Sequence, residues 1–447
     1  MARCGAMGFI EGEARGQGAL FPTSLEELIP QDHFCRVIDA FVNRLDMQRL
    51  GFVRAEAAET GRPGYDPRDL LKLYLYGYLQ QIRSSRRLEN ECRRNVELLW
   101  LLGRLYPDHK SIAEFRRLHR QAVSEAGAEL VKLARSVGLI RGEWVAIDGS
   151  KFRAASSVSS VHERILLERY LEGLDTADGE DELRVENGAV ALALEKLRQH
   201  TEPEVRFMKT SQGMLPAYNV QTAVDAEHGL IVAQKVSDEP ADNRSLLPMA
   251  EAAQAALEGT SSPLHVVADA GYSNGEQAAS CESQGILPHI PAKRGVNTRG
   301  RQLFDRTAFR YQEQSNTMLC PAGHSLRSDG RSGRALAYLG RPEVCGACTL
   351  KPQCTTSRRR TVHRHVYEEA LERMHQRATP AAMALRRRTV EYPFAILKYG
   401  IFRHPRFLLR GLDGARCEIG LAVMAYNLKR MLNLLGGAVL KNALQTT

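Results

Sequence analysis

The sequence predicts an α/β protein in which a mixed-sheet core follows an all-α N-terminal domain and contains two insertions. Helical periodicity and helix caps run through the first 140 residues, whereas two later apolar runs end on Asp148 and Asp269. Four cysteines then fall close together in a stretch with few apolar residues. We therefore divide the chain into a helical domain, the first part of the core, a cysteine-cluster insertion and the C-terminal helices of the core, at residues 1–140, 141–310, 311–365 and 366–447.

The composition is that of a folded globular chain with a basic balance. Of 447 residues, 43% are hydrophobic and 25% are charged, which excludes a disordered or fibrous protein. Sixty-one Lys and Arg against 52 Asp and Glu give a formal net charge of +9. This excess favours a polyanionic partner such as nucleic acid, although many enzymes are mildly basic for no functional reason.

The chain shows no sign of a membrane or secreted protein. No run approaches the roughly 18 apolar residues that span a bilayer, and the first residues contain acidic and Gly positions where a signal peptide needs a continuous apolar stretch. We therefore expect a cytoplasmic protein without a membrane partner. In a reducing compartment, its nine cysteines are more often thiols or metal ligands than disulfides.

Basic residues recur on two of the predicted N-terminal helices. Asp66-Pro67 opens one helix, and later helical stretches contain RSSRRLENECRRN and SIAEFRRLHR. Such helices can lie against DNA phosphates, and the equal alternative is a solvated face on a helical bundle. The candidate DNA-binding residues of this domain are Arg86, Arg87, Arg116 and Arg117.

The core is expected to hold two acidic residues at strand ends. GEWVAIDGSKF indicates a central strand that delivers Asp148 to its carboxyl end, and LHVVADAGY repeats this pattern at Asp269. Between them, residues 217–223 and 230–236 indicate a β-hairpin, which makes the sheet mixed. A charged helical insertion is expected at residues 160–205.

The cysteine cluster predicts a structural zinc site in a small insertion. Its ligands are four thiols, two of them in a C-x2-C pair, and four thiolates complete one tetrahedron. His324 follows the first cysteine by four residues and is an alternative ligand, while buried thiols without a metal are the other alternative. The stretch has too few apolar residues to hold itself folded without a metal. The four thiols are those of Cys320, Cys345, Cys348 and Cys354.

A long helix is expected after Pro380. Within it, Arg387, Glu391 and Lys398 are spaced by four and seven residues, so they lie close to one helical face. Pro393 lacks a backbone donor, and we expect a kink or a new helix start near Glu391. Taken alone, this pattern also fits an exposed, salt-bridged face.

Asp148, Asp269 and Glu391 together suit phosphodiester chemistry. Two divalent ions about 4 Å apart, held by carboxylates, activate a water or a 3′-hydroxyl and stabilise the leaving oxygen. Oxygen ligands favour Mg²⁺ or Mn²⁺. Asp148 is the natural shared ligand, Asp269 and Glu391 each complete one ion, and Arg387 and Lys398 are expected to contact DNA phosphates.

At these residues the sequence resembles the bacterial insertion-sequence transposases that have a ribonuclease H-like DDE catalytic domain. DGSKFRA at 148 is similar to their first-Asp motif, YNVQTAVD at 218 to the hairpin and DAGYSNG at 269 to the second-Asp motif. RTVEYPFAILK carries the R-x3-E-x6-K pattern around Glu391. The N-terminal helical domain and the inserted cysteine cluster, which we expect to be zinc-ribbon-like, resemble one branch of this family. Ala384 departs from it, because a tyrosine often stands at that place.

The resemblance implies cut-and-paste transposition by a nucleoid-associated protein. It implies hydrolysis at terminal inverted repeats, attack of 3′-hydroxyls on target DNA, two Mg²⁺ or Mn²⁺ ions at each active site, and a homodimer or larger synaptic complex. Two other functions stay open. One is a non-catalytic DNA-binding regulator derived from a transposase, and the other is a nuclease of the same fold that does not join strands.

Overall fold

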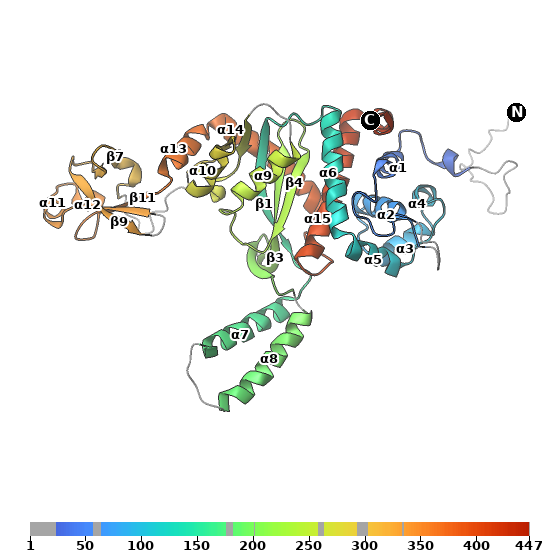
Figure 1. The fold of residues 1–447 in the computed structure, drawn as a ribbon, viewed down its shortest axis with the longest axis horizontal. Coiled ribbons are helices and arrows are strands. Elements are labelled where there is room, and N and C mark those ends of the chain that lie inside the picture. The colour runs from blue at the N-terminus through green and yellow to red at the C-terminus, as the bar shows by residue number, and fades with distance from the viewer. Residues whose placement is uncertain are drawn as a thin grey trace, which may run out of the picture.

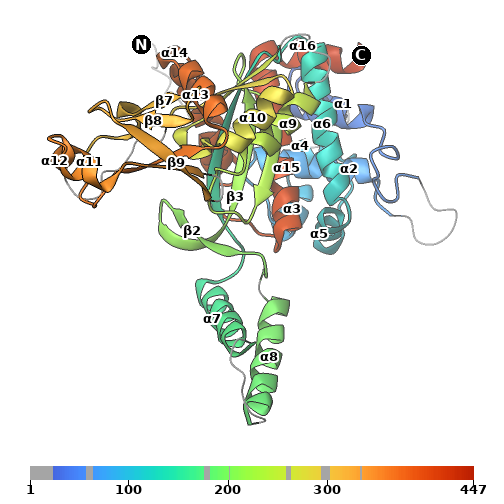
Figure 2. The ribbon, with the colours of Figure 1, turned by 60° about the vertical axis from the view of Figure 1, so that its left-hand side comes forward.

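The computed structural model describes residues 24–56, 64–175, 182–200, 202–257, 263–292, 303–332 and 335–446. Figure 1 shows a central α/β core with the N-terminal helices on one side and a small β-rich domain on the other. A helical hairpin projects from the core, and it stands clear of the rest of the chain in Figure 2 as well. Residues 1–23, which include Cys4, lie outside the described part of the expected N-terminal domain.

The N-terminal region is helical, as the sequence predicts. Asp66 caps the second helix by accepting a hydrogen bond from the Arg68 amide at 2.8 Å, and Pro67 occupies its first turn. This helix is buried on nearly all sides, because neighbouring helices pack around its tyrosines and leucines. The elements are η1 (Leu25–Leu28), α1 (Phe34–Arg44), α2 (Pro67–Leu79), α3 (Ser85–Cys92), α4 (Val96–Leu101), α5 (His109–Leu118) and α6 (Arg120–Ser136).

The core contains a six-stranded mixed sheet in the order β2-β3-β1-β5-β6, with β4 also paired to β3. β1 runs antiparallel to β3 and parallel to β5, and β5 is parallel to β6. The expected hairpin is confirmed, since β3 and β4 pair antiparallel. The strands are β1 (Trp144–Arg153), β2 (Arg206–Thr210), β3 (Gly213–Asp225), β4 (Ile231–Ser237), β5 (Leu264–Val267) and β6 (Ile286–His289).

Helices cover both faces of β1. Because successive side chains of a strand point to opposite faces, Ala146 lies on one face, where it packs with Val267 and with Val390 of α14 (Pro380–Ala395). Val145 and Ile147 lie on the other face, in the main core. Asp148 shares the parity of Ala146 and is therefore directed toward the α14 side. The other helices of the core are α9 (Leu246–Ala256), α10 (Gly275–Ser283) and α13 (Glu368–Arg377), with a short 3-10 turn η2 (Ala270–Tyr272).

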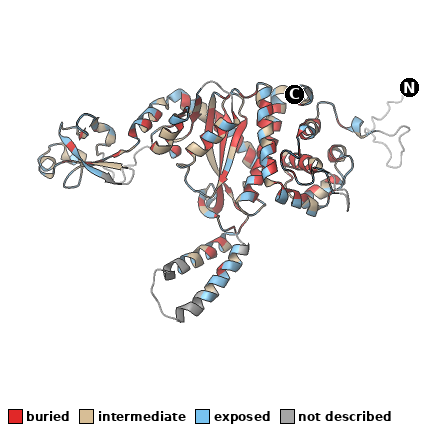
Figure 3. Cartoon of the chain, viewed as in Figure 1, coloured by how far each residue is buried: buried red, intermediate tan, exposed pale blue. Residues whose placement is uncertain are grey.

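The C-terminal helices join the N-terminal region to the core. α15 (Leu412–Leu435) packs against α2, α6 and β4, and α16 (Gly437–Thr446) packs against α1. Figure 3 shows buried residues concentrated in the sheet and in the helices beside it. The buried side chain of Glu418 accepts hydrogen bonds from the Arg83 guanidinium and the amides of Leu408 and Leu409. The two regions therefore share one core rather than two separate ones.

Two insertions leave this core. The helical insertion is a hairpin of α7 (Val158–Asp175) and α8 (Glu182–His200). The small domain is a second, antiparallel sheet in the order β11-β10-β9-β8-β7, with its own core of Phe309, Met318, Leu326, Tyr338 and Val362. Its elements are η3 (Arg306–Ala308), β7 (Arg310–Gln312), β8 (Thr317–Leu319), β9 (Ser325–Ser332), β10 (Ala335–Leu339), α11 (Pro342–Gly346), α12 (Lys351–Cys354) and β11 (Thr361–His365). No described helix is long and apolar enough to cross a membrane.

Candidate active site

The sheet register places Asp148 and Asp269 side by side. Ala146 pairs with Val267 at the end of the parallel β1–β5 ladder, and each aspartate follows its own strand's member of that pair by two positions. The sequence suggested that Asp148 ends its strand, but the strand continues beyond it. β1 continues to Arg153 because the long strand β3 keeps pairing with it, and Asp148 lies opposite Thr222. The end of the parallel ladder, rather than the end of β1, therefore defines the site.

One arginine bridges the two aspartates. The Arg386 guanidinium lies 3.0 Å from Asp148 Oδ1 and 3.8 Å from Asp269 Oδ2. Arg386 belongs to the α14 face that carries Ala382 and Val390 at spacings of four, which is the face packed on the sheet. A single cation thus holds together two carboxylates that would otherwise repel each other.

Burial raises the pKa of the Asp148 carboxyl, and the charge of Asp269 raises it further, while Arg386 lowers it. Lys398 lies nearby. Burial lowers the pKa of the Lys398 ammonium, and the charge of Asp148 opposes this effect. Lys398 comes from a π-helical segment (Ile396–Ile401) that directly follows α14. Pro393 is accommodated within α14, so the irregular turn falls after the proline and not at Glu391.

Two glycines beside the aspartates stand where there is no room for a side chain. A side chain at Gly149 would clash, since a Cβ there would meet the Gln221 amide at 2.2 Å and Asp242 Oδ1 at 2.8 Å. At Gly271 a Cβ would lie 2.8 Å from Asp269 Oδ1, which accepts a hydrogen bond from the Gly271 amide at 2.7 Å. The lack of space for a side chain thus explains the glycines in the DG and DAG patterns of the sequence.

A polar network lies behind Asp148. Asp242 Oδ1 accepts hydrogen bonds from the Asn219 and Gln221 amides, each at 2.7 Å, and lies 3.1 Å from Lys151 Nζ. The Tyr272 hydroxyl donates to the other end of the Gln221 side chain. Asp242 and Lys151 also border a recess together with Lys398, Arg153 and Lys209. This recess beside the aspartates is therefore mainly basic.

Glu391 does not join the aspartates in this structure. It is exposed on α14, and among the described residues it forms no group with Asp148 and Asp269 that could hold a metal ion. Glu391 follows Arg386 by five positions, which places the two side chains about 140° apart around the helix. Arg387 is exposed as well, so the aspartates meet Arg386 instead of the R-x3-E face.

The four candidate DNA-binding arginines of the N-terminal region divide into two groups. Arg86, Arg87 and Arg117 are exposed. Arg116 is only 4% exposed, lies 4.9 Å from the centroid of the Tyr74 ring and donates to the Arg83 carbonyl at 3.3 Å. The prediction for Arg116 is wrong, because this side chain is used inside the fold and cannot reach a DNA surface.

The four clustered thiols converge on one cavity at the outer end of the small domain. Cys320, Cys345, Cys348 and Cys354 line it together with His324. Burial raises the pKa of the Cys354 thiol, and the other three thiols raise it further, which reflects their proximity. Among the described residues, however, no group of three or more His, Cys, Asp or Glu side chains is arranged so that it could hold a metal ion. The other described cysteines, Cys35, Cys92, Cys281 and Cys417, are buried singly.

Two family profiles match the sequence. One, described as a transposase domain (DUF772), matches residues 23–118. The other, described as a transposase DDE domain, matches residues 196–428, which is more than half of the chain. The chain belongs to the DDE transposase family. It is thus a DNA transposase, an enzyme that acts on DNA with divalent metal ions.

Other comparisons add little about this transposase. No curated protein matches its sequence. A solved structure, a piggyBac transposase synaptic complex with hairpin DNA, is 9% identical and aligns over 90% of this chain and 78% of that one. Its TM-score of 0.31 is too low to carry an argument. The family assignment therefore rests on the profiles.

Arg386 is the site residue of this DDE transposase that the sequence patterns did not single out. The signal was present in the sequence, because Arg386 falls in a row of spacing four with Ala382 and Val390, both buried. The R-x3-E-x6-K pattern favours Arg387 instead. Asp242, whose neighbourhood in the sequence has loop composition, carries no local pattern that marks it as part of the site.

Proposed function

We propose that this transposase moves an insertion sequence by cut-and-paste transposition, cleaving at terminal inverted repeats and joining the freed 3′-hydroxyls to target DNA. The observation that carries the proposal is that Asp148 and Asp269 lie side by side, each two positions beyond the last pair of the β1–β5 ladder. The strand order fits a ribonuclease H-like core, in which a hairpin flanks the first strand and parallel strands follow. Family membership supplies the reaction class.

The two aspartates fit a divalent cation, because their carboxylates already share the single cation of Arg386. We propose that Asp148 and Asp269 hold Mg²⁺ or Mn²⁺, two ions in each active site. Glu391 is proposed as the third ligand, and because it lies apart from the aspartates in this structure, α14 has to shift to bring it to them. Such ions supply Lewis acidity and neutralise charge on a phosphodiester. Support for Glu391 comes from the R-x3-E-x6-K pattern that it shares with Lys398, because the charge of Asp148 opposes the lowering of the Lys398 pKa by burial.

The protein's own residues prepare the site for a polyanion. Arg386 has to release both carboxylates when they take a metal, and its guanidinium is then free to meet a phosphate. Lys398 and Lys151 line the recess next to Asp148, where they would neutralise the DNA backbone. Asp242 holds Lys151 at 3.1 Å and so fixes one of these charges in place. Arg387 follows Arg386 and is exposed, and we propose that it contacts DNA outside this recess.

We further propose that the small domain is zinc-ribbon-like and holds one structural Zn²⁺ through Cys320, Cys345, Cys348 and Cys354. The four thiols line one cavity, and the small apolar core beside it gives limited stability without a metal. His324 lines the same cavity but lies on the loop after Cys320, and we assign it no ligand role because four thiolates complete a tetrahedron.

Exposed arginines on α3 and α5, namely Arg86, Arg87 and Arg117, are proposed to hold DNA beside the active site. A homodimer or larger synaptic complex is proposed as the working form, since two element ends have to be brought together in one reaction.

The decisive experiment incubates purified protein with Mg²⁺, labelled DNA carrying the element's terminal repeats and a supercoiled target plasmid. Labelled ends joined to the target support the transposase mechanism. Cleavage without joining would indicate a nuclease of the same fold, and binding without cleavage would indicate a regulator derived from a transposase. Either of these two outcomes overturns the proposal.

A further inference from the structure

The small domain carries a concentrated positive charge that neither the active site nor the N-terminal helices use. Residues 303–365 contain eleven Lys and Arg against four Asp and Glu, an excess of seven, whereas the whole chain has an excess of nine. A short segment therefore carries most of the net charge of the protein. Charge concentrated in this way favours a polyanion as the partner.

Three of these cations already have partners within the protein. Arg306 pairs with Glu368 of α13. Arg360 donates to the carbonyls of Cys354 and Phe304. Arg364 lies 3.9 Å from the centroid of the Tyr311 ring. Five others are exposed, and among the described residues none of them forms an ion pair: Arg310, Arg327, Arg341, Arg358 and Arg359.

The sheet register gathers these five arginines at one end of the domain. Arg310 pairs with Leu319, which pairs with Ser325 at the start of β9. Arg327 pairs with Leu339, which pairs with Thr361. Arg341 follows Leu339 by two residues, and Arg358 and Arg359 precede Thr361 by three and two. We call these five residues, Arg310, Arg327, Arg341, Arg358 and Arg359, the arginine rim.

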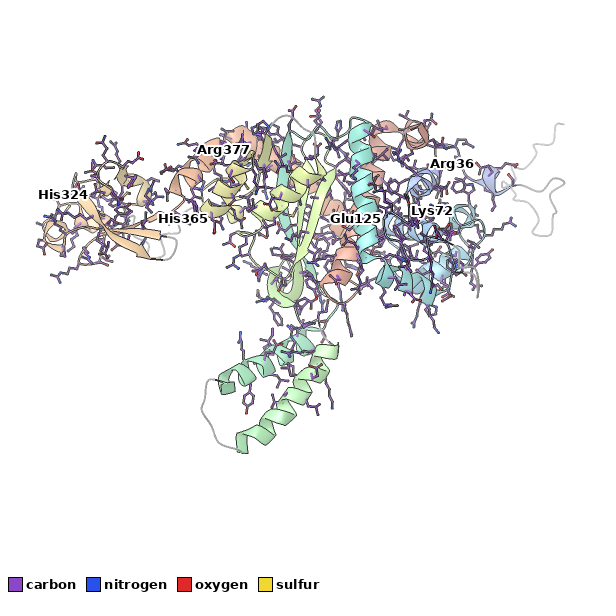
Figure 4. All side chains as sticks on the ribbon, in the orientation of Figure 1. Arg36, Lys72, Glu125, His324, His365 and Arg377 are labelled. Carbon is purple, nitrogen blue, oxygen red and sulfur yellow. The ribbon has the colours of Figure 1, made fainter. Side chains whose placement is uncertain are left out.

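The arginine rim lies at the end of the domain that faces away from the core. His365 pairs with Ala335 at the opposite end of the sheet. Figure 4 places His324, which lines the thiol cavity with Arg327 and Arg341, at the outer tip, and His365 on the side of the core. Between residues 339 and 361 the only acidic residue is Glu343. The segment between β10 and β11 is thus nearly uniform in charge.

We propose that the arginine rim binds the phosphate backbone of duplex DNA, at a place separate from the aspartate pair and from α3 and α5. Exposed guanidinium groups gathered around one end of the sheet suit phosphate oxygens, which accept two parallel hydrogen bonds from one arginine. The contact is to the backbone and carries no sequence preference of its own. It holds DNA at a second point and fixes its path past the core.

This inference rests on membership of the transposase family, and it does not require the roles proposed for Glu391 or the thiols. Its test uses the full-length protein and a random-sequence DNA duplex, with affinity measured over a range of KCl concentrations. The test variant combines Arg341→Gln, Arg358→Gln and Arg359→Gln. The matched control combines Lys132→Gln, Arg141→Gln and Lys429→Gln, which removes three exposed charges from other surfaces. Because the readout is binding, a failure of the proposed catalytic residues leaves it unaffected.

The rim variant should bind on the order of tenfold to a hundredfold more weakly at moderate salt, and its salt dependence should flatten by about 0.9 for each phosphate that the protein no longer neutralises. The control should keep the parental slope. A third variant with lysine at the same three positions should retain most of the slope, because charge alone meets a phosphate. Unchanged binding by the glutamine variant, an equal loss in the control, or an equal loss in the lysine variant would each overturn the proposal.

Discussion

Arg386 and Asp148 form the ion pair at the centre of the candidate site, with 3.0 Å between the guanidinium and the carboxylate. Both side chains are about one-fifth exposed. The same guanidinium lies 3.8 Å from Asp269, so one protein cation stands where we propose that the divalent metal binds. The ion pair therefore keeps the carboxylates together, and it would compete with the proposed metal.

Replacing Arg386 by glutamine should weaken the metal-free protein and strengthen its response to Mg²⁺. Loss of the cation leaves two adjacent carboxylates unpaired, at a cost of about 1–3 kcal/mol in unfolding free energy. A bound ion restores that loss, so the rise in melting temperature on adding Mg²⁺ should exceed that of the parent. Arg388→Gln, an exposed neighbour on the same helix, is the control. Equal Mg²⁺ responses in all three proteins would contradict the competition.

Asp148→Asn should stabilise the metal-free protein at neutral pH. Burial raises the pKa of Asp148 in the folded state, so the folded chain holds this proton to higher pH than the unfolded chain does. The resulting stability is present below the unfolded pKa and is lost as pH rises through the folded pKa. Thermal unfolding should show the variant's advantage at neutral pH shrinking as the solution is acidified. Asp413→Asn, an exposed surface site, should show no such trend, and an advantage that grows in acid would rule this account out.

Arg116 and Arg117 should behave differently although they are neighbours. Arg116→Ala removes a buried cation that stacks on Tyr74, and we expect a loss of about 2–4 kcal/mol in unfolding free energy. Arg117→Ala should leave stability within about 0.5 kcal/mol and reduce the salt dependence of DNA binding by about 0.9. Denaturant unfolding and DNA titration separate the two effects. A stable Arg116→Ala protein with weakened DNA binding would restore the role expected from the sequence.

Zinc should copurify with the protein in about one equivalent, as expected for a single four-thiolate site. Cys345→Ser should lose the metal and unfold the small domain, while His324→Ala should keep it. Cys281→Ala is the matched control, because burial raises the pKa of that thiol to about 12 and it stays protonated within the core. Metal analysis of the four proteins provides the measurement. A metal-free parent, or a Cys345→Ser variant with full metal content, would remove the site.

The sequence predicted the elements of the core because their patterns are local. The apolar runs before Asp148 and Asp269 and the hairpin between them follow from strand periodicity, and the register then brings the two acids together. The length of β1 was not predictable from GSKFR, since its polar residues resemble a strand end. They remain in the sheet because β3 supplies a partner for each of them.

Side-chain direction on helices was harder to predict than the helices themselves. Arg386 and Arg387 are adjacent and chemically identical, and only the packing of Val390 against Ala146 and Val267 decides which one meets the aspartates. The same holds for Arg116 and Arg117, where burial of Ile112 one turn earlier turns Arg116 inward. Tertiary contacts decide which side of a helix faces the core, and a spaced sequence motif does not specify that side.

Glu391 provides the most direct test of the claim that three carboxylates act together. The measurement is the rate of DNA end cleavage with Mg²⁺ by Glu391→Gln, beside Glu372→Gln, which removes an exposed glutamate from the preceding helix α13. We expect a loss on the order of a thousandfold for Glu391→Gln, with end binding and thermal stability unchanged, and parental cleavage for Glu372→Gln. Cleavage by Glu391→Gln at the parental rate would contradict this expectation and would leave Asp148 and Asp269 without their third partner.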